Sequence, residues 1–255
     1  MTLPPLFIAH GSRMMAVEAG KTGDFLRKLG EELPRPKAIL CVSAHWMTEA
    51  PVVAGTAKPE TIHDFYGFPE ALYRIRYPAP GAADLAMRTQ ELLQGTGCVI
   101  DPDYGLDHGA WVPLSYLYPK ADIPVAQLSV QPYRDAAWHF RLGEALAPLR
   151  EEGVLILGSG SSTHNLRELH RGSDAVVPWA AAFDDWLGRT LEDGKTVEAL
   201  DWVEAAPQAL RAHPTPEHFL PLFVPLGAAH GAAGRRINTG FSSGTLSLSA
   251  FAFGG

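Results

Sequence analysis

The 255-residue sequence has few cysteines, no excess of positive charge and no long hydrophobic run, and each shortage excludes a class of protein. Two cysteines, Cys41 and Cys98, are too few for a disulfide framework, and Cys41 lies in an apolar run where a buried thiol is expected. The formal net charge of -7 argues against a nucleic-acid-binding face, which needs a basic surface. No apolar run reaches the roughly 18 residues that span a bilayer, and no secretory signal begins the sequence. We expect a soluble, cytoplasmic protein that binds neither nucleic acid nor membrane.

Short apolar runs alternate with amphipathic segments along the chain, and this alternation predicts an α/β fold. Runs with the length of strands occupy residues 6–9, 38–43, 98–101, 124–130, 154–157 and 246–253. Helices are expected at residues 16–33, 82–93, 136–149, 179–193, 197–205 and from 216 to 226. We expect one domain over residues 1–255, with a mixed or mostly parallel sheet flanked by helices.

Residues 47–81 form a long irregular stretch that is rich in proline and in aromatic side chains. Loops of this length inside a compact domain usually bear on function, and the aromatic content argues against disorder. We therefore expect this segment to bear on function, and its residues 63–66 to form a lid over a site.

Four of the ten histidines stand next to apolar runs in a way that predicts a shared site. His10 follows the run 6–9, His45 follows the run 38–43, and His164 follows the run 154–157 after a glycine- and serine-rich turn. His218 comes just ahead of the apolar residues 219–226. The carboxyl ends of parallel strands meet at one edge of a sheet, where ligands bind. Four others, His139, His170, His213 and His230, are expected to be ordinary surface or core residues.

Other interpretations of these residues stay open at this point. The turn GSGSSTHNL before His164 could cradle a phosphate, although it lacks the Walker lysine and does not match G-x-G-x-x-G. A serine nucleophile with His164 as its base is a further alternative, with a poor match to G-x-S-x-G. His218 could be an ordinary residue in the first turn of a helix that Thr215 caps.

Imidazoles gathered at one strand edge, without clustered cysteines, suit a borderline divalent metal such as Fe(II) or Zn(II). The compact zinc signatures H-E-x-x-H and C-x-x-C do not occur in the sequence. Spacing along the chain does not decide between these metals, because the candidate ligands are far apart.

The chain resembles the DODA-type branch of the extradiol ring-cleavage dioxygenases, the class III or LigB superfamily. The matching motifs run in family order over almost the whole chain: AHGS, VSAHW, TIHDFYGFP, YPAPG, DHGAWVPL, QLSV, AAWHF, SGSSTHNLR and TPEHFLPL. Each motif is weak alone, and the set is specific.

The resemblance implies that His10 and His45 bind a non-haem metal, Fe(II) or alternatively Zn(II). It also implies a third ligand from the last third of the chain, for which we expect His218 and keep Glu217 as the alternative. His164 resembles the acid/base histidine of the superfamily, although it could also bind the metal. His108 resembles a second histidine that lines the substrate pocket.

The implied reaction opens the ring of a catechol, such as DOPA or a related substituted catechol, with dioxygen. We expect the loop residues His63, Asp64 and Tyr66 to contact the substrate, and a homodimer is the possible assembly. Two alternatives stay open: a zinc hydrolase or an inactive zinc-binding homologue, and a non-catalytic binding module on an α/β scaffold.

One departure from the family pattern concerns the residue three positions after His10. The family commonly has His-Gly-Ser-Pro-Met, and this chain has Arg13 at the proline position. A cation so close to the first expected ligand could pair with a carboxylate of the substrate, or it could be solvated at the surface.

Overall fold

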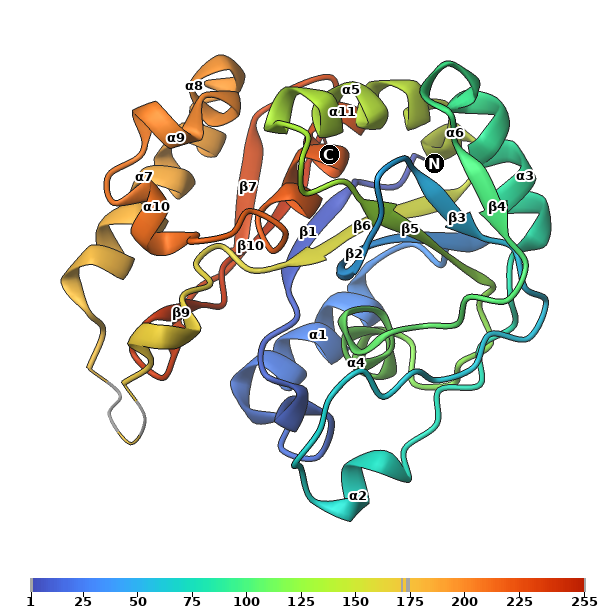
Figure 1. Ribbon diagram of the computed structural model, residues 1–255, viewed down its shortest axis with the longest axis horizontal. Helices are drawn as coiled ribbons and strands as arrows, with labels where there is room; N and C mark the ends of the chain where they lie inside the picture. Colours follow the sequence, from blue (N-terminus) through green and yellow to red (C-terminus); the bar gives the residue numbers. More distant parts are fainter. Residues whose placement is uncertain (1, 171, 173–174, 255) are drawn as a thin grey trace.

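The structure is a computed structural model that describes residues 2–170, 172 and 175–254. Its core is an eight-stranded sheet (Figure 1). The strands lie in the order β4-β3-β5-β2-β6-β1-β10-β7. Their bounds are β1 (Leu6–Ala9), β2 (Ala38–Met47), β3 (Val52–Ala54), β4 (Val99–Asp101), β5 (Val125–Val130), β6 (Val154–Gly160), β7 (Gly234–Asn238) and β10 (Ala250–Phe253). A separate two-stranded ribbon pairs β8 (Phe241–Ser242) with β9 (Leu246–Ser247).

The centre of the sheet is parallel. β5, β2, β6 and β1 pair with one another in parallel, and β3 pairs in parallel with β4. Antiparallel pairs join β3 to β5, β1 to β10 and β10 to β7. The predicted α/β fold with a mixed, mostly parallel sheet is confirmed, and the carboxyl ends of β1, β2 and β6 lie at the same edge.

Helices cover both faces of the sheet (Figure 1). α1 and α4 lie on one face, α3, α5 and α11 lie on the other, and α7 to α10 form a group at the β7 end. The helices are α1 (Gly20–Glu32), α2 (Glu70–Tyr73), α3 (Ala83–Leu92), α4 (His108–Leu117), α5 (Ala136–Leu146), α6 (Pro148–Glu151), α7 (Pro178–Glu192), α8 (Thr196–Leu200), α9 (Trp202–Ala205), α10 (Ala209–Ala212) and α11 (Phe223–Ala228). Short 3-10 turns include η1 (Arg13–Ala16), η3 (Leu166–Glu168) and η4 (Leu220–Leu222).

The central strands β1, β2 and β6 begin with uninterrupted apolar runs because both faces of the sheet are buried there. In β2, Ile39 and Cys41 pack into the core on the α1 and α4 side, while Leu40 and Val42 pack under α5 and α11. Cys41 is fully buried, as its place in the apolar run predicts. No helix of the described ranges combines the length and apolar character that crossing a membrane requires.

Several predicted boundaries are wrong, each for a local reason. β2 continues to Met47, so His45 lies within the strand, after its pairing with β6 has ended at Ser43. The helix predicted from residue 16 begins at Gly20, where φ is +53°, because the left-handed backbone there separates it from η1. The helix predicted at residues 136–149 ends at Leu146, and Pro148 opens α6.

The helix predicted from residue 216 also begins later than expected. Glu217 and His218 lie in a turn, and regular helix starts with the 3-10 turn η4 and continues as α11. The sequence analysis missed β3 and β7, which lie in segments without a clear apolar alternation.

Candidate metal centre

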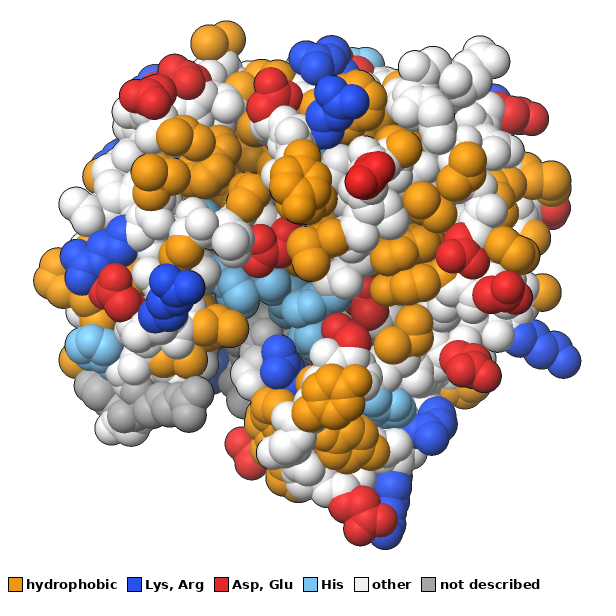
Figure 2. Space-filling model, viewed as in Figure 1, with side chains coloured by type: hydrophobic (Ala, Val, Ile, Leu, Met, Phe, Trp, Pro, Cys, Tyr) orange, Lys and Arg blue, Asp and Glu red, His pale blue; other side chains and the backbone are white. Residues whose placement is uncertain are grey.

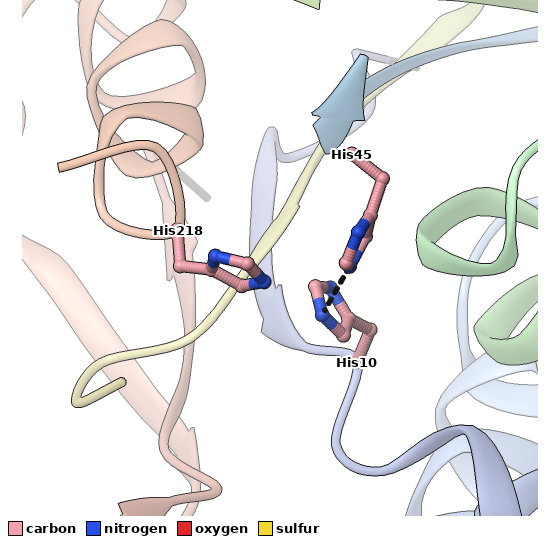
Figure 3. Close-up of side chains that lie close together, drawn as sticks. All are labelled: His10, His45 and His218. Carbon is pink, nitrogen blue, oxygen red and sulfur yellow. Dashed lines mark hydrogen bonds between the residues drawn. The ribbon is translucent and has the colours of Figure 1, made fainter. Parts of the chain in front are cut away.

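Three histidines that are far apart in the sequence meet at one edge of the sheet (Figure 3). His10 follows β1 directly, and His45 lies near the end of β2. These two strands flank β6 on either side. His218 lies in the turn ahead of η4.

Backbone hydrogen bonds at the end of β6 hold both His10 and His218. The backbone N–H of His10 donates to the Gly160 carbonyl at 3.1 Å, and the N–H of Ser161 donates to the His218 carbonyl at 2.8 Å. A Cβ added to Gly160 would lie 2.1 Å from the His218 oxygen. Only glycine therefore lets the turn that carries His218 approach the sheet this closely.

The three rings face one another. Nε2 of His10 and Nε2 of His45 are 3.1 Å apart, and the ring centroid of His218 lies 5.3 Å from that of His10 and 4.9 Å from that of His45. One nitrogen from each ring lies within 4.8 Å of the other two. Imidazole nitrogens bind zinc at about 2.0–2.1 Å, so nitrogens this close need small rotations at most to share one ion.

The far nitrogen of His10 has a partner that decides which nitrogen is protonated. Ser159 Oγ donates to the Gly109 carbonyl at 2.5 Å and lies 3.1 Å from His10 Nδ1. Since the hydroxyl proton is already used, Nδ1 of His10 donates to Ser159. The lone pair of His10 is then at Nε2, which faces His45.

The far nitrogens of His218 and His45 lie near carboxylates. Glu217 Oε1 is 2.9 Å from Nδ1 of His218, and Asp64 Oδ2 is 3.5 Å from Nδ1 of His45. Metal-binding histidines commonly use the second nitrogen in this way. Nε2 of His218 is buried and has no hydrogen-bond partner among the described residues. A bound cation would supply one, so the donor set fits a divalent metal.

Burial lowers the pKa of all three imidazoles. The pKa of His45 falls from 6.5 to about 3, chiefly because the ring loses solvation and then because His108 is close. The pKa values of His10 and His218 lie well below 6.5 for the same chief reason, with neighbouring histidines adding to it. The rings are therefore neutral at pH 7, which is the form that binds a metal.

His164 lies beside these rings and stacks on His218, with ring centroids 3.4 Å apart. Burial lowers the pKa of His164 to about 4, the charge of Glu217 opposes that change, and Arg13 adds to it. The ring is therefore neutral at pH 7 and can accept a proton. His164, Glu217 and His218 also have the spacing of a ligand group, so the alternative that His164 binds the metal stays open.

His108 lies on the other side, with its ring centroid 3.8 Å from that of His45. Asp64 accepts from the His108 backbone N–H at 3.0 Å and from its ring Nδ1 at 2.7 Å. Burial opposes the ionisation of Asp64, but the hydrogen bonds and charge of His108 outweigh it and lower the pKa of Asp64 to about 2. This bond occupies Nδ1 of His108 and leaves Nε2 without a partner from Asp64.

Sequence reasoning gave no role to Asp107, which holds the start of α4. Its side chain caps the helix at the Ala110 N–H and accepts from the Ser43 hydroxyl at 2.6 Å and from the Gln127 amide. Burial raises the pKa of Asp107. This network ties the helix that carries His108 to β2 and β5. The N-cap pattern of Asp107 ahead of α4 is the signal that could have revealed it.

The histidines line a cavity of about 740 Å³. Figure 2 shows histidine side chains in a hollow of the surface, bordered by basic, acidic and hydrophobic groups. Five of its lining residues are the histidines already described: His10, His45, His108, His164 and His218. Gly67 and Phe68 line it from the 47–81 segment, and Arg13 lines it beside His10.

The predicted substrate-binding residues lie in three different settings. Asp64 is bound to His108, as described above. Nε2 of His63 lies 3.2 Å from the Ile75 carbonyl, and its ring packs 5.6 Å from that of Trp111. Tyr66 is 91% exposed. His63, Asp64 and Tyr66 are all outside the cavity lining, so their contact with a substrate stays a prediction.

The turn after β6 uses its own polar groups, which weighs against the alternatives raised for it. The N–H of Ser161 donates to His218 and the N–H of His164 donates to Ala212, so these groups are not free for a phosphate. The Ser161 hydroxyl donates to the Thr163 carbonyl at 2.8 Å. No hydrogen bond joins a serine to the His164 ring within the described ranges.

Comparison with known proteins places the chain in a family. Residues 4–254 match the family described as the catalytic LigB subunit of aromatic ring-opening dioxygenase. A relative from Beta vulgaris named 4,5-DOPA dioxygenase extradiol is 48% identical over 97% of this chain and 95% of its own length. An Escherichia coli K12 relative of the same name is 42% identical over 96% of this chain and 93% of its own length.

A solved structure supports the same relationship. The crystal structure of an uncharacterized protein from Escherichia coli K12 superposes with a TM-score of 0.84 at 35% identity, and the match covers 99% of this chain and 100% of the other. The family match, the identity to these relatives and the structural superposition agree, and the chain belongs to the LigB family of aromatic ring-opening dioxygenases.

Proposed function

We propose that His10, His45 and His218 bind Fe(II) in this cavity and that the protein opens the ring of a catechol with dioxygen, beside the diol. The whole chain then acts as one extradiol dioxygenase domain. The observation that carries the proposal is the convergence of three neutral imidazoles, one of which has a buried Nε2 without a partner among the described residues. Three protein ligands leave coordination positions free for a substrate and dioxygen.

Bound Fe(II) supplies a path for electrons between the catechol and dioxygen and holds the two reactants next to each other. The protein's own groups supply proton transfer. His164 is neutral at pH 7 and sits beside His218, so it accepts a proton from a catechol hydroxyl and later returns it. His108 lines the cavity with Nδ1 held by Asp64, and its Nε2 donates a hydrogen bond to the substrate or to dioxygen.

The substrate we propose is a substituted catechol such as DOPA. The two relatives described above carry DOPA in their names, and a cavity of about 740 Å³ holds a catechol with a side chain. Phe68 in the cavity wall offers an apolar surface for the ring. His63 and Tyr66 would reach the substrate only if their loop moved inward over it. A cytoplasmic location and a homodimer belong to the same proposal.

Anaerobic reconstitution with Fe(II), followed by dioxygen uptake with a panel of catechols, tests this function. We expect uptake of one dioxygen per catechol and a new absorption band from the ring-opened semialdehyde. The matched controls are the same protein loaded with Zn(II) and the His218→Ala variant, both of which should be inactive. Lack of uptake with every catechol in protein that holds stoichiometric Fe(II) would contradict the proposal and favour a zinc-binding homologue without ring-cleaving activity.

A further inference from the structure

Arg13 lies in the wall of the cavity that contains the histidines. Ser12 caps the 3-10 turn η1 by accepting from the Met14 N–H at 3.3 Å, and Arg13 is the first residue of that turn. Its side chain lines the cavity together with His10 and Phe68. Of the two alternatives that the sequence leaves open, this position disfavours a purely solvated arginine, since the residue is only partly exposed.

The guanidinium group rests on aromatic rings of the 47–81 segment. Its central carbon lies 5.1 Å from the ring centroid of Phe68 and 5.8 Å from that of Phe65. Phe65 is buried, so the platform has a fixed position. A cation–π contact of this kind uses the charge of the guanidinium and none of its N–H groups, so these stay available for hydrogen bonds. Arg13 is thus held in place without use of its hydrogen-bond donors.

The charge of Arg13 is not balanced by a neighbouring acid. Within the described ranges, no ion pair or side-chain hydrogen bond involves Arg13, whereas the two carboxylates nearest the histidines are already engaged. Asp64 is bound to His108, and Glu217 is bound to His218. The positive charge of Arg13 acts on histidines of the cavity, where it helps to lower the pKa of His45 and of His164.

We infer that Arg13 is a specificity-determining residue that binds an acidic substituent of the substrate, a carboxylate on the side chain of the catechol. This inference rests on the proposed function for the placement of the diol and adds a contact for the other end of the same molecule. A planar guanidinium matches a carboxylate with two parallel hydrogen bonds, and the carboxylate neutralises the unbalanced charge. The protein therefore selects acidic catechols over neutral catechols of the same size.

A matched pair of catechols isolates the charge of the substituent: 3,4-dihydroxyphenylpropanoate and its neutral methyl ester. We expect Arg13→Gln to raise KM for the acid by about 10- to 100-fold, the usual range for the loss of a charged hydrogen-bond pair, and to leave KM for the ester nearly unchanged. Arg13→Lys keeps the charge and should retain more of the preference than Arg13→Gln. An equal change for acid and ester, or equal losses in the two variants, would overturn the inference.

The matched control is Arg134→Gln, because Arg134 is an exposed arginine over an aromatic ring, that of Trp138, and does not line the cavity. Its replacement should leave the discrimination between acid and ester unchanged. A loss as large as that of Arg13→Gln would show that net surface charge, and not a contact in the cavity, selects the acid.

Equilibrium binding separates this inference from the proposed reaction. Titration calorimetry of both catechols on Zn(II)-loaded protein, without turnover, should show tighter binding of the acid by the natural protein and loss of that preference in Arg13→Gln. Wild-type protein that binds acid and ester equally overturns the role of Arg13. A preference for the acid without ring cleavage by the Fe(II) form would support Arg13 and contradict the dioxygenase function.

Discussion

Two carboxylates hold histidines at opposite ends of the cavity, and they do so in different ways. Asp64 uses both of its oxygens: Oδ1 accepts from the backbone and Oδ2 accepts from the ring of His108. Glu217 uses one oxygen, Oε1, which contacts Nδ1 of His218 at 2.9 Å and the Thr215 hydroxyl at 3.1 Å. Asp64 Oδ2 also lies 3.5 Å from Nδ1 of His45, so this one carboxylate contacts two imidazoles.

This difference separates two tasks. At the Asp64 end the firmly held ring, His108, belongs to a helix and lies outside the proposed ligand set. At the Glu217 end the ring belongs to the proposed set and sits on a turn. We therefore expect damage at the Asp64 end to appear in turnover and damage at the Glu217 end to appear in metal affinity.

Outside the proposed metal ligands, the largest effect on turnover is expected from His164, the ring stacked on His218. Loss of a general acid–base group typically costs about 10²–10⁴ in rate, and we expect His164→Ala to lower kcat by that factor. Metal content, measured by elemental analysis, should stay close to that of the natural protein. Loss of metal in parallel with loss of activity would make His164 a ligand and extend the Glu217 end of the cavity.

The next largest effect on turnover is expected at Asp64, whose two oxygens both accept hydrogen bonds from His108. An amide has one acceptor oxygen, so Asp64→Asn does not satisfy both N–H groups of His108 and leaves the protonated nitrogen of its ring undecided. Loss of such a partner costs about 10–100-fold, and we expect kcat to fall toward the upper part of that range with metal content retained. Asp103→Asn, which removes an exposed carboxylate, is the control. A fall in metal content without a fall in kcat per bound metal would reverse the comparison.

A smaller effect is expected from Glu217→Gln. The glutamine oxygen still accepts from His218, so only the charge of the partner is lost. We expect metal affinity to weaken by about 10-fold, the lower end of the range for outer partners, when it is measured by competition with a chelator. The kcat of fully metal-loaded protein should change little. Unchanged affinity in both Glu217→Gln and Glu217→Ala would remove Glu217 from the support of His218.

The smallest change is expected with pH. Protons compete with the metal for imidazole nitrogens, so three histidines with the ordinary pKa of about 6.5 would lose about 1,000-fold in affinity between pH 7.5 and pH 5.5. Burial lowers the pKa of His10, His45 and His218, so protons compete less with the metal over this interval and the loss moves to lower pH. Chelator competition at the two pH values should differ by less than about 10-fold. A loss near 1,000-fold would mean that the rings titrate as if they were exposed.

The sequence predicts the centre of the sheet well because the parallel strands carry a strong local signal. β1, β5 and β6 are mostly apolar stretches of strand length, and all of their residues are buried. β7 carries charged residues, and its place at the sheet edge depends on β10. The helix expected from residue 216 begins later because Glu217 and His218 form a turn that packs against Gly160. Nothing in the local sequence pattern reveals this contact.

The candidate site divides in the same way. Histidines next to strand ends could be found from the sequence, because the end of a parallel strand is a position that the chain itself marks. Their assignment as ligands stays a prediction. The role of Ser159 could not be assigned, since it acts across a contact between distant segments. The N-cap pattern marks Asp107, but its bond to Ser43 also joins distant segments. Arg13 was visible as a departure from the family pattern, but its aromatic platform depends on how residues 65 and 68 fold back.

The missing side chain at Gly160 has a wider consequence. The turn that carries His218 packs backbone against backbone on β6. No side chain at this contact can therefore change its rotamer to adjust the distance between the turn and the strand. A single methyl group added at position 160 would push the His218 imidazole away from those of His10 and His45, although all three histidines would still be present. The spacing of the three rings is thus controlled by a residue that contributes no donor atom.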